Sequence, residues 1–449
     1  MKRQRHGFAL GFIVIFVAGS IGRAAAEGVA MAQPAAPAGQ TNGAFVTREE
    51  YDKLKSELEE LKARFNAMKS EKTTNTIETI QSLDYVNQRV DQLEEDTRKF
   101  WPGFNRVIIA GDANATFISQ EGSKSSFGAE LAPLILWQLN DRLLFEGGFD
   151  IGIDNGGELG SGETTFDLSI AELSYLLNDY LTIGAGLFVV PFGVYHNHFD
   201  PPWINQLPDD PLPFGDGGIA ADSAVGVFGE GAVPIGPTVL NYDVYVSNGP
   251  RLITDDPSAA GSLGFDNYVD NNNAKTFGGR IGFRPIPEVE FGYSMQYGQV
   301  GVDSFRNVDA FLQAVDAEFR RDYSRIYGQI DFRAELVLSH VDRATYGLTA
   351  SPPFGPFTFN NNRNGGYVQI GYRPWMVDLP VISKLQLVGR YDWLHSSLAA
   401  PGGDRENRWT AGLNYWLQPN VVLKGAYEFD HKKSGQDADA VLVQLGIGL

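Results

Sequence analysis

The side chains with the clearest chemical potential in this sequence are ionisable residues that recur at alternate positions of short apolar segments. In residues 143–154, Leu143 and Phe145 fall on one face of a strand, and Glu146 and Asp150 fall on the other. Successive strand residues point to opposite faces, so this spacing separates apolar side chains from carboxylates. Charges along such a face attract or repel solutes, which is electrostatic selection and not the breaking of bonds.

The charges on these polar faces separate by sign along the chain. The first seven segments contribute the acidic residues Asp112, Glu146, Asp150, Glu172, Glu230 and Asp243. Later segments contribute the basic residues Arg280, Arg284, Arg325, Arg333, Arg373, Arg390, Arg408 and Lys424, beside the acids Glu290, Asp331, Asp392, Glu428 and Asp430. We predict that an acidic half-wall and a basic half-wall line one lumen. The alternative is that these charges pair with one another or lie in solvated vestibules.

Catalytic and metal chemistry is not indicated by the sequence. The 449 residues include no cysteine, which excludes disulfides, thiolate metal sites and a cysteine nucleophile. The serine motif G-x-S-x-G is also absent. His196, His198 and Asp200 have metal-ligand chemistry at strand-like spacing, but no fourth ligand is evident. A net charge of −19 argues against nucleic acid as a partner. We predict no enzymatic activity, no metal and no cofactor.

The sequence pattern predicts that many short strands position these charges. We predict sixteen, near residues 105–118, 127–138, 142–153, 164–177, 180–190, 223–234, 238–248, 275–284, 288–299, 321–332, 335–344, 364–373, 384–395, 407–418, 420–430 and 438–449. An even number is what bacterial outer-membrane barrels require. Apolar faces rich in Phe, Tyr and Trp favour lipid outside and water inside, whereas a soluble sandwich would bury these faces in one shared core. The predicted fold class is all-β, a 16-stranded antiparallel transmembrane β-barrel over residues 101–449.

The predicted connections alternate between short and long. Long ones lie near 191–222, 249–274, 300–320 and 345–363, whereas Arg333–Glu335 must act as a tight turn. Outer-membrane barrels have short periplasmic turns and long external loops. Because the first short turn follows the second strand, we expect the chain to enter the barrel from the periplasm.

The N-terminal part predicts export and a coiled coil before the barrel. Residues 1–26 combine a basic start, an apolar stretch and an A-x-A site, as in a signal peptide. Residues 27–46 have the Ala/Pro/Gly composition of a flexible linker. In residues 47–100, apolar side chains recur at spacings of three and four, which predicts an α-helical coiled coil in the periplasm. A single amphipathic helix packed on a domain is the alternative. Dimeric and trimeric coils are both open.

Three motifs of the barrel region resemble the phosphate-selective porin O/P family, namely the runs 186–193, 171–175 and 247–249. The resemblance covers residues 101–449. It implies a homotrimer, diffusion through each monomer, and a third extracellular loop, by position 191–222, that folds inward as a constriction. This loop has no Lys or Arg and carries the acidic residues Asp200, Asp209, Asp210 and Asp216. Acidic charge in a narrow passage repels anions, which argues against phosphate capture.

We therefore expect an outer-membrane porin that passively conducts small hydrophilic solutes or ions. Its expected partners are outer-membrane lipid and further copies of the chain, with peptidoglycan as a candidate partner of the coil. The alternative is a structural barrel that tethers the outer membrane to the cell wall through the coil, or that sheaths a partner protein.

Overall fold

The computed structural model describes residues 107–154, 163–215, 217–254, 256, 258–265, 272–347, 355–400 and 402–449. The predicted signal peptide, linker and coiled coil lie outside the described residues, and so does Asp216.

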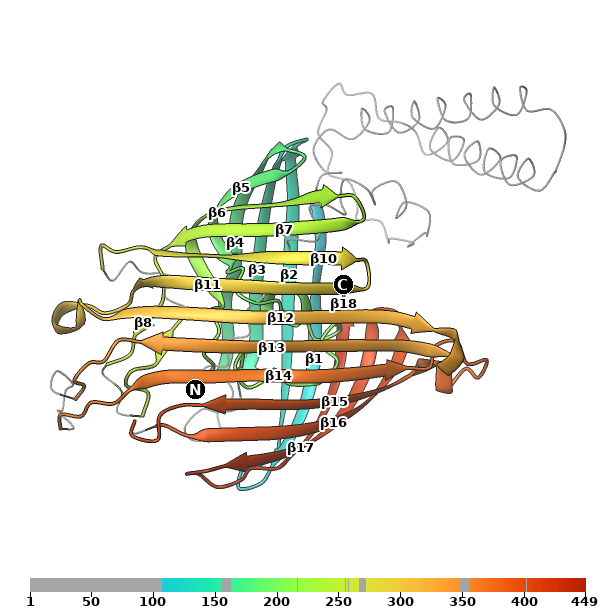
Figure 1. Ribbon diagram of the computed structural model, residues 1–449. Helices are drawn as coiled ribbons and strands as arrows, with labels where there is room; N and C mark the ends of the chain where they lie inside the picture. Colours follow the sequence, from blue (N-terminus) through green and yellow to red (C-terminus); the bar gives the residue numbers. More distant parts are fainter. Residues whose placement is uncertain are drawn as a thin grey trace, which may run out of the picture. The chain divides into compact units, whose positions relative to one another are not determined.

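Sixteen strands of the described part form one closed barrel (Figure 1). They are β1 (Val107–Gln120), β2 (Ser126–Asn140), β3 (Leu143–Asp154), β4 (Glu163–Asn178), β5 (Leu181–Val189), β6 (Ser223–Ile235), β7 (Thr238–Ser247), β10 (Thr276–Ile286), β11 (Val289–Gln299), β12 (Asp309–Tyr323), β13 (Gly328–Val341), β14 (Asn361–Arg373), β15 (Leu385–His395), β16 (Arg405–Gln418), β17 (Val421–Lys432) and β18 (Ala440–Gly448). Each strand pairs with its neighbours in the chain, and antiparallel pairing of β18 with β1 closes the barrel. The predicted sixteen-stranded antiparallel barrel is confirmed.

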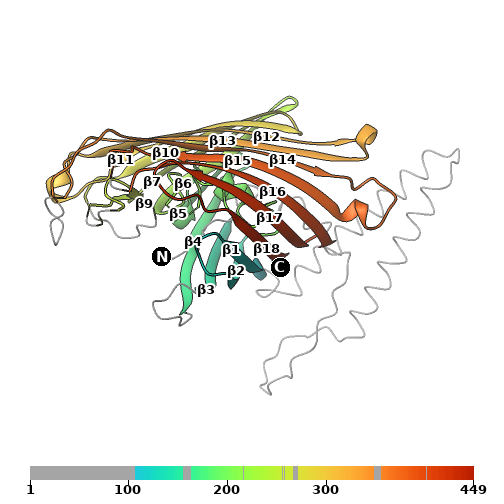
Figure 2. The same cartoon turned by 90° about the horizontal axis from the view of Figure 1, so that it is seen from below.

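Two opposite walls can be followed in both views of the barrel. Strands β12–β16 form one wall and β2–β5 form the other (Figure 2). A separate two-stranded sheet, β8 (Arg251–Leu252) and β9 (Leu263–Gly264), lies in the connection between β7 and β10. The described residues include no helix that is both long and apolar enough to cross a membrane.

The two faces of each strand differ in polarity as the alternation predicts. On β10, Phe277, Ile281 and Phe283 are exposed on the outer face, whereas Arg280 is buried on the inner face. On β16, Trp409 and Leu413 are exposed in the same way. Exposed apolar side chains around a closed barrel are suited to hydrocarbon, where every backbone group must find its partner within the barrel.

Aromatic residues mark both ends of this apolar exterior. Near the long connections, Tyr391, Trp409 and Phe429 are direct neighbours on β15, β16 and β17. Near the short turns, Tyr327 and Trp375 are exposed. Two aromatic belts of this kind are typical of the two interfaces of a bilayer.

The prediction for strands ten and eleven was wrong in its boundaries. The segment 309–320, which was expected to belong to a long loop, is the larger part of β12, and the turn lies at η5 (Ser324–Ile326) instead of 333–335. The inward-facing Leu312 and its neighbours at 310 and 314 pack in an apolar cluster inside the barrel. Both faces of this segment are therefore apolar, and the alternation is weak. The turn carries no Gly, Pro, Asn or Asp signal, and Tyr327 itself adopts the left-handed conformation with φ 54°.

A charge placed on the outer face near the middle of a strand tests the lipid-facing assignment. Leu413 is 50% exposed on β16. We expect Leu413→Arg to destabilise the inserted barrel by about 2–4 kcal/mol, because arginine is costly at the depth of hydrocarbon. Unfolding by urea in lipid vesicles, followed by gel mobility, measures this loss. Leu413→Ala is the matched control without a charge, and an arginine variant as stable as that control would contradict the assignment.

Candidate functional site

The connection between β5 and β6, residues 190–222, is the centre of the candidate site and is called the inserted loop here. It includes the single-turn helix η3 (Tyr195–Phe199), and much of it is buried. Its hydrogen bonds reach inward-facing side chains of β11, β13 and β14–β18. One segment can contact the inner faces of so many strands of a closed barrel only from within it.

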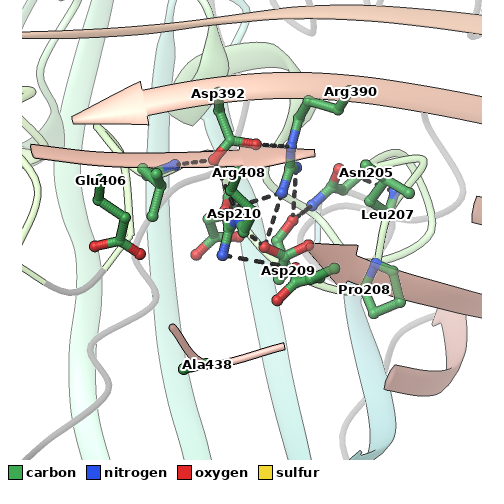
Figure 3. A network of polar contacts seen from close by, with 12 residues as sticks. Asn205, Leu207, Pro208, Asp209, Asp210, Arg390, Asp392, Glu406, Arg408 and Ala438 are labelled. Carbon is green, nitrogen blue, oxygen red and sulfur yellow. Dashed lines mark hydrogen bonds and ion pairs between the residues drawn. The ribbon is translucent and has the colours of Figure 1, made fainter. Parts of the chain in front are cut away.

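An ion-pair cluster at Asp209 and Asp210 fixes the inserted loop against β15 and β16 (Figure 3). The Asp209 carboxylate lies 2.7 Å from Nη2 of both Arg390 on β15 and Arg408 on β16. Asp392 lies between the same two guanidinium groups, at 2.7 Å from Arg390 Nε and 3.1 Å from Arg408 Nε. Both arginines also donate to the backbone carbonyl of Asp210, at 3.2 and 2.7 Å. The cluster therefore holds the loop through both its side chains and its backbone.

This cluster changes the predicted arrangement of charges. Arg390 and Arg408 were expected to belong to a basic half-wall that lines the lumen, but they contact Asp209 of the inserted loop directly. Burial raises the pKa of Asp209, but the guanidinium groups of Arg390 and Arg408 outweigh it and hold this pKa well below its ordinary value. At these residues the alternative of paired charges is the correct one.

A second set of hydrogen bonds holds the loop against β16, β17 and β18. Lys424 donates through Nζ to the carbonyl of Leu207 at 3.1 Å and to Gln444 Oε1 at 2.7 Å. Gln444 in turn donates to the carbonyl of Pro208 at 3.1 Å. Asn414 donates to the carbonyl of the residue before Leu207 at 2.8 Å. Polar groups of the strands thus satisfy the buried carbonyls of the loop, which would otherwise be costly.

The near end of the loop is held against β11 and β13. The amide of Gly193 donates to Ser294 Oγ at 2.9 Å, and the next amide donates to Glu335 at 3.4 Å. Gly193 has φ +71°, and a Cβ there would clash with Glu335 Oε1, so this bend requires glycine. Further on, Phe199 packs under the guanidinium of Arg333, 3.8 Å from ring centre to Cζ.

Most of the other predicted basic residues also form ion pairs with Asp or Glu side chains. Arg280 bonds Asp316 at 2.6 Å and Glu290 at 3.1 Å, and Arg333 bonds Asp331 at 2.8 Å. Arg284 also pairs with Glu290.

Two further basic residues, Arg325 and Arg373, are in other environments: one lies outside the lumen wall and the other stacks on an aromatic ring. Arg325 lies in the exposed turn η5 and not on the lumen wall, because the strand boundaries differ. Arg373 is on β14, where its guanidinium stacks 4.7 Å from the ring centre of Trp416.

Four of the six predicted acidic wall residues line one cavity between the start of the inserted loop and the strands β3–β7 and β10. They are Glu146, Glu172, Glu230 and Asp243. The volume of this cavity is about 70 Å³. The predicted acidic half-wall is therefore a local group of carboxylates on the side of the barrel opposite the Asp209 cluster.

The remaining predicted acidic residues lie outside that cavity. Asp112 is buried on β1, and Asp150 is half-buried on β3 opposite Asp167. In the loop, Asp210 accepts a hydrogen bond from the Tyr195 hydroxyl at 2.9 Å, and Asp200 follows η3 half-buried.

The histidine motif is not brought together as a metal site. His198 pairs with Glu318 at 3.3 Å, and His196 points toward Asp222 at 3.9 Å. No group of three or more His, Cys, Asp or Glu side chains in the described ranges could hold a metal ion.

Sequence reasoning missed several residues that hold the loop. Glu335, which accepts from the loop, was assigned to a turn, so its inward direction was not recognised. Asp316, which pairs with Arg280 and not with the loop, was likewise hidden in a predicted long connection. Gln444 and Ser294 are uncharged, and only their alternate positions on β18 and β11 could have pointed to them.

Comparisons with known proteins find similarity to solved structures at low sequence identity only. No protein-family profile and no curated protein matches the chain. The chain is similar to Salmonella typhi OmpF in complex with daunomycin, with 14% identity, a TM-score of 0.49, and coverage of 76% of this chain and 97% of that one. It is similar to the outer membrane channel DcaP of Acinetobacter baumannii, with 13% identity, a TM-score of 0.47, and coverage of 76% and 97%. It is also similar to Pseudomonas aeruginosa OpdK with vanillate, with 11% identity, a TM-score of 0.41, and coverage of 77% and 99%. Membership of the phosphate-selective porin O/P family stays a prediction.

Proposed function

We propose that this protein is an outer-membrane channel that passively conducts small hydrophilic solutes and prefers cations. The inserted loop narrows the barrel, and solutes pass along the wall formed by β3–β7. The lipid-suited exterior and the closed barrel support the membrane part of this proposal. A barrel of sixteen strands is wide enough for an aqueous channel.

The observation that carries the cation preference is the contrast between the two sides of the loop. On one side, Arg390 and Arg408 are neutralised by Asp209 and Asp392. On the other side, a cavity is lined by four carboxylates. Net negative charge beside a narrow aqueous passage raises the local concentration of cations and repels anions.

Recordings from the full-length protein in planar lipid bilayers test the proposal. We expect steady conductance steps that persist at low voltage without any added energy source. A barrel that inserts but stays electrically silent would contradict channel function and would favour the structural alternative.

We also propose the assembly and location that the N-terminal sequence predicts. Residues 1–26 direct export, residues 27–46 link, and residues 47–100 form a periplasmic coiled coil that supports a homotrimer of barrels, with peptidoglycan as a candidate partner. The support is the apolar seam of the coil. Chemical cross-linking of the full-length protein in detergent, read as the largest covalent species, tests the trimer.

A further inference from the structure

The carboxylates of the cavity form two like-charge pairs across neighbouring strands. Glu146 on β3 lies directly opposite Glu172 on β4, and Glu230 on β6 lies directly opposite Asp243 on β7. Residues directly opposite in an antiparallel pair have Cβ atoms about 4.5–5.5 Å apart, and like charges there are destabilising. Two such pairs on one wall call for a compensating positive charge.

Glu146 is the most enclosed member of this group. It is 1% exposed, and it lines the cavity. Its Oε1 accepts no hydrogen bond from any of the residues that the structure describes. A buried carboxylate oxygen without a partner is costly, so this atom is suited to a donor that arrives with a solute.

The two basic side chains that line the cavity form hydrogen bonds or ion pairs with acids outside the group of four. Arg280 faces Asp243 in register, but its hydrogen bonds go to Glu290 and Asp316. His198 pairs with Glu318. Arg280 and His198 thus also serve acids outside the group of four, which leaves the carboxylates of the cavity in excess.

The same cavity has an apolar side. Leu144 and Ile170 line it, together with Phe188 and Phe228, whose ring centres are 4.9 Å apart. Small inorganic cations have no apolar surface to bury against such side chains, whereas an aromatic or alkyl group has. Aromatic rings near an ammonium group add attraction through their negative faces.

We propose that this cavity binds organic cations in which an ammonium or guanidinium group is attached to a compact apolar body. The cationic group bonds Glu146 and its carboxylate neighbours, and the apolar body packs against the two phenylalanine rings. This inference rests on the proposed channel function, for which it names the class of solute.

Transient block of the ion current by 2-phenylethylammonium tests the site. With full-length protein in a planar bilayer, we expect concentration-dependent block that is stronger than block by ethylammonium, with none by phenylacetate. Glu146→Gln should weaken binding about tenfold, which corresponds to about 1.4 kcal/mol. Glu121→Gln, at an exposed turn between β1 and β2, is the matched control and should leave the block unchanged.

The outcomes separate this inference from channel function. A conducting protein that 2-phenylethylammonium does not block, or blocks equally in wild type and Glu146→Gln, overturns the site and leaves the channel intact. Absence of any conductance overturns the proposed function instead. If Glu146→Gln does not insert, Glu230→Gln replaces it, and an unchanged block in that variant likewise overturns the site.

Discussion

Asp209→Ala is expected to give a larger and noisier single-channel conductance together with a less stable protein. The substitution leaves Arg390 and Arg408 buried without their shared carboxylate on the loop. Removing one partner of a buried ion pair costs about 3–5 kcal/mol. This part of the inserted loop then loses its ion pairs and keeps its neutral contacts, among them the backbone contact from Lys424 and the packing of Leu207 against Val388. The loop should leave its position for part of the time, which widens the passage.

Two measurements check this prediction. Planar-bilayer recordings give the conductance and its noise, and thermal unfolding followed by gel mobility gives the stability. Asp378→Ala removes an exposed carboxylate in the connection between β14 and β15 and is the matched control. Wild-type conductance combined with wild-type stability in Asp209→Ala would show that the cluster does not hold the loop.

Neutralising the acidic wall is expected to abolish the cation preference. The variant is Glu146→Gln, Glu172→Gln, Glu230→Gln and Asp243→Asn combined, which removes every carboxylate that lines the cavity from the strands. The reversal potential under a KCl gradient should move to zero or beyond, because the local excess of potassium ions depends on these charges. The change should be largest in dilute salt, where the screening length is about 30 Å at 0.01 M and about 3 Å at 1 M.

A variant with the same change in net charge serves as the control for this prediction. Glu121→Gln, Asp141→Asn, Asp179→Asn and Asp378→Asn lie in exposed turns and connections. They alter the charge of the whole protein by an equal amount without touching the cavity. If both fourfold variants shift the reversal potential equally, selectivity comes from overall charge and not from the wall.

The alternation of side chains was enough to predict the barrel but not all of its strands. On β10 the contrast between outward Ile281 and inward Arg280 is plain in the sequence, and the structure has it. On β12 the inward face carries Leu312 in a buried apolar cluster, so both faces read as apolar and the strand was missed. Alternation identifies a wall that faces water, and it fails where the inner face packs against protein.

The pairing of charges could not be predicted in the same way. Asp209 and Arg390 are 181 positions apart in the chain, and only the path of the inserted loop brings them together. The separation of acidic from basic residues is visible in the sequence, but which of them neutralise one another depends on that path. Glu146, by contrast, was identified on its strand by position alone, although the sequence could not show that its Oε1 accepts no hydrogen bond from the described residues.

The most direct test of the account is the reversal potential of the unmodified full-length protein in a planar bilayer under a KCl gradient. We predict a sign that corresponds to potassium passing more readily than chloride, since the carboxylates of the β3–β7 wall border the passage and the arginines that contact the loop are paired. A reversal potential whose sign corresponds to chloride preference would contradict it.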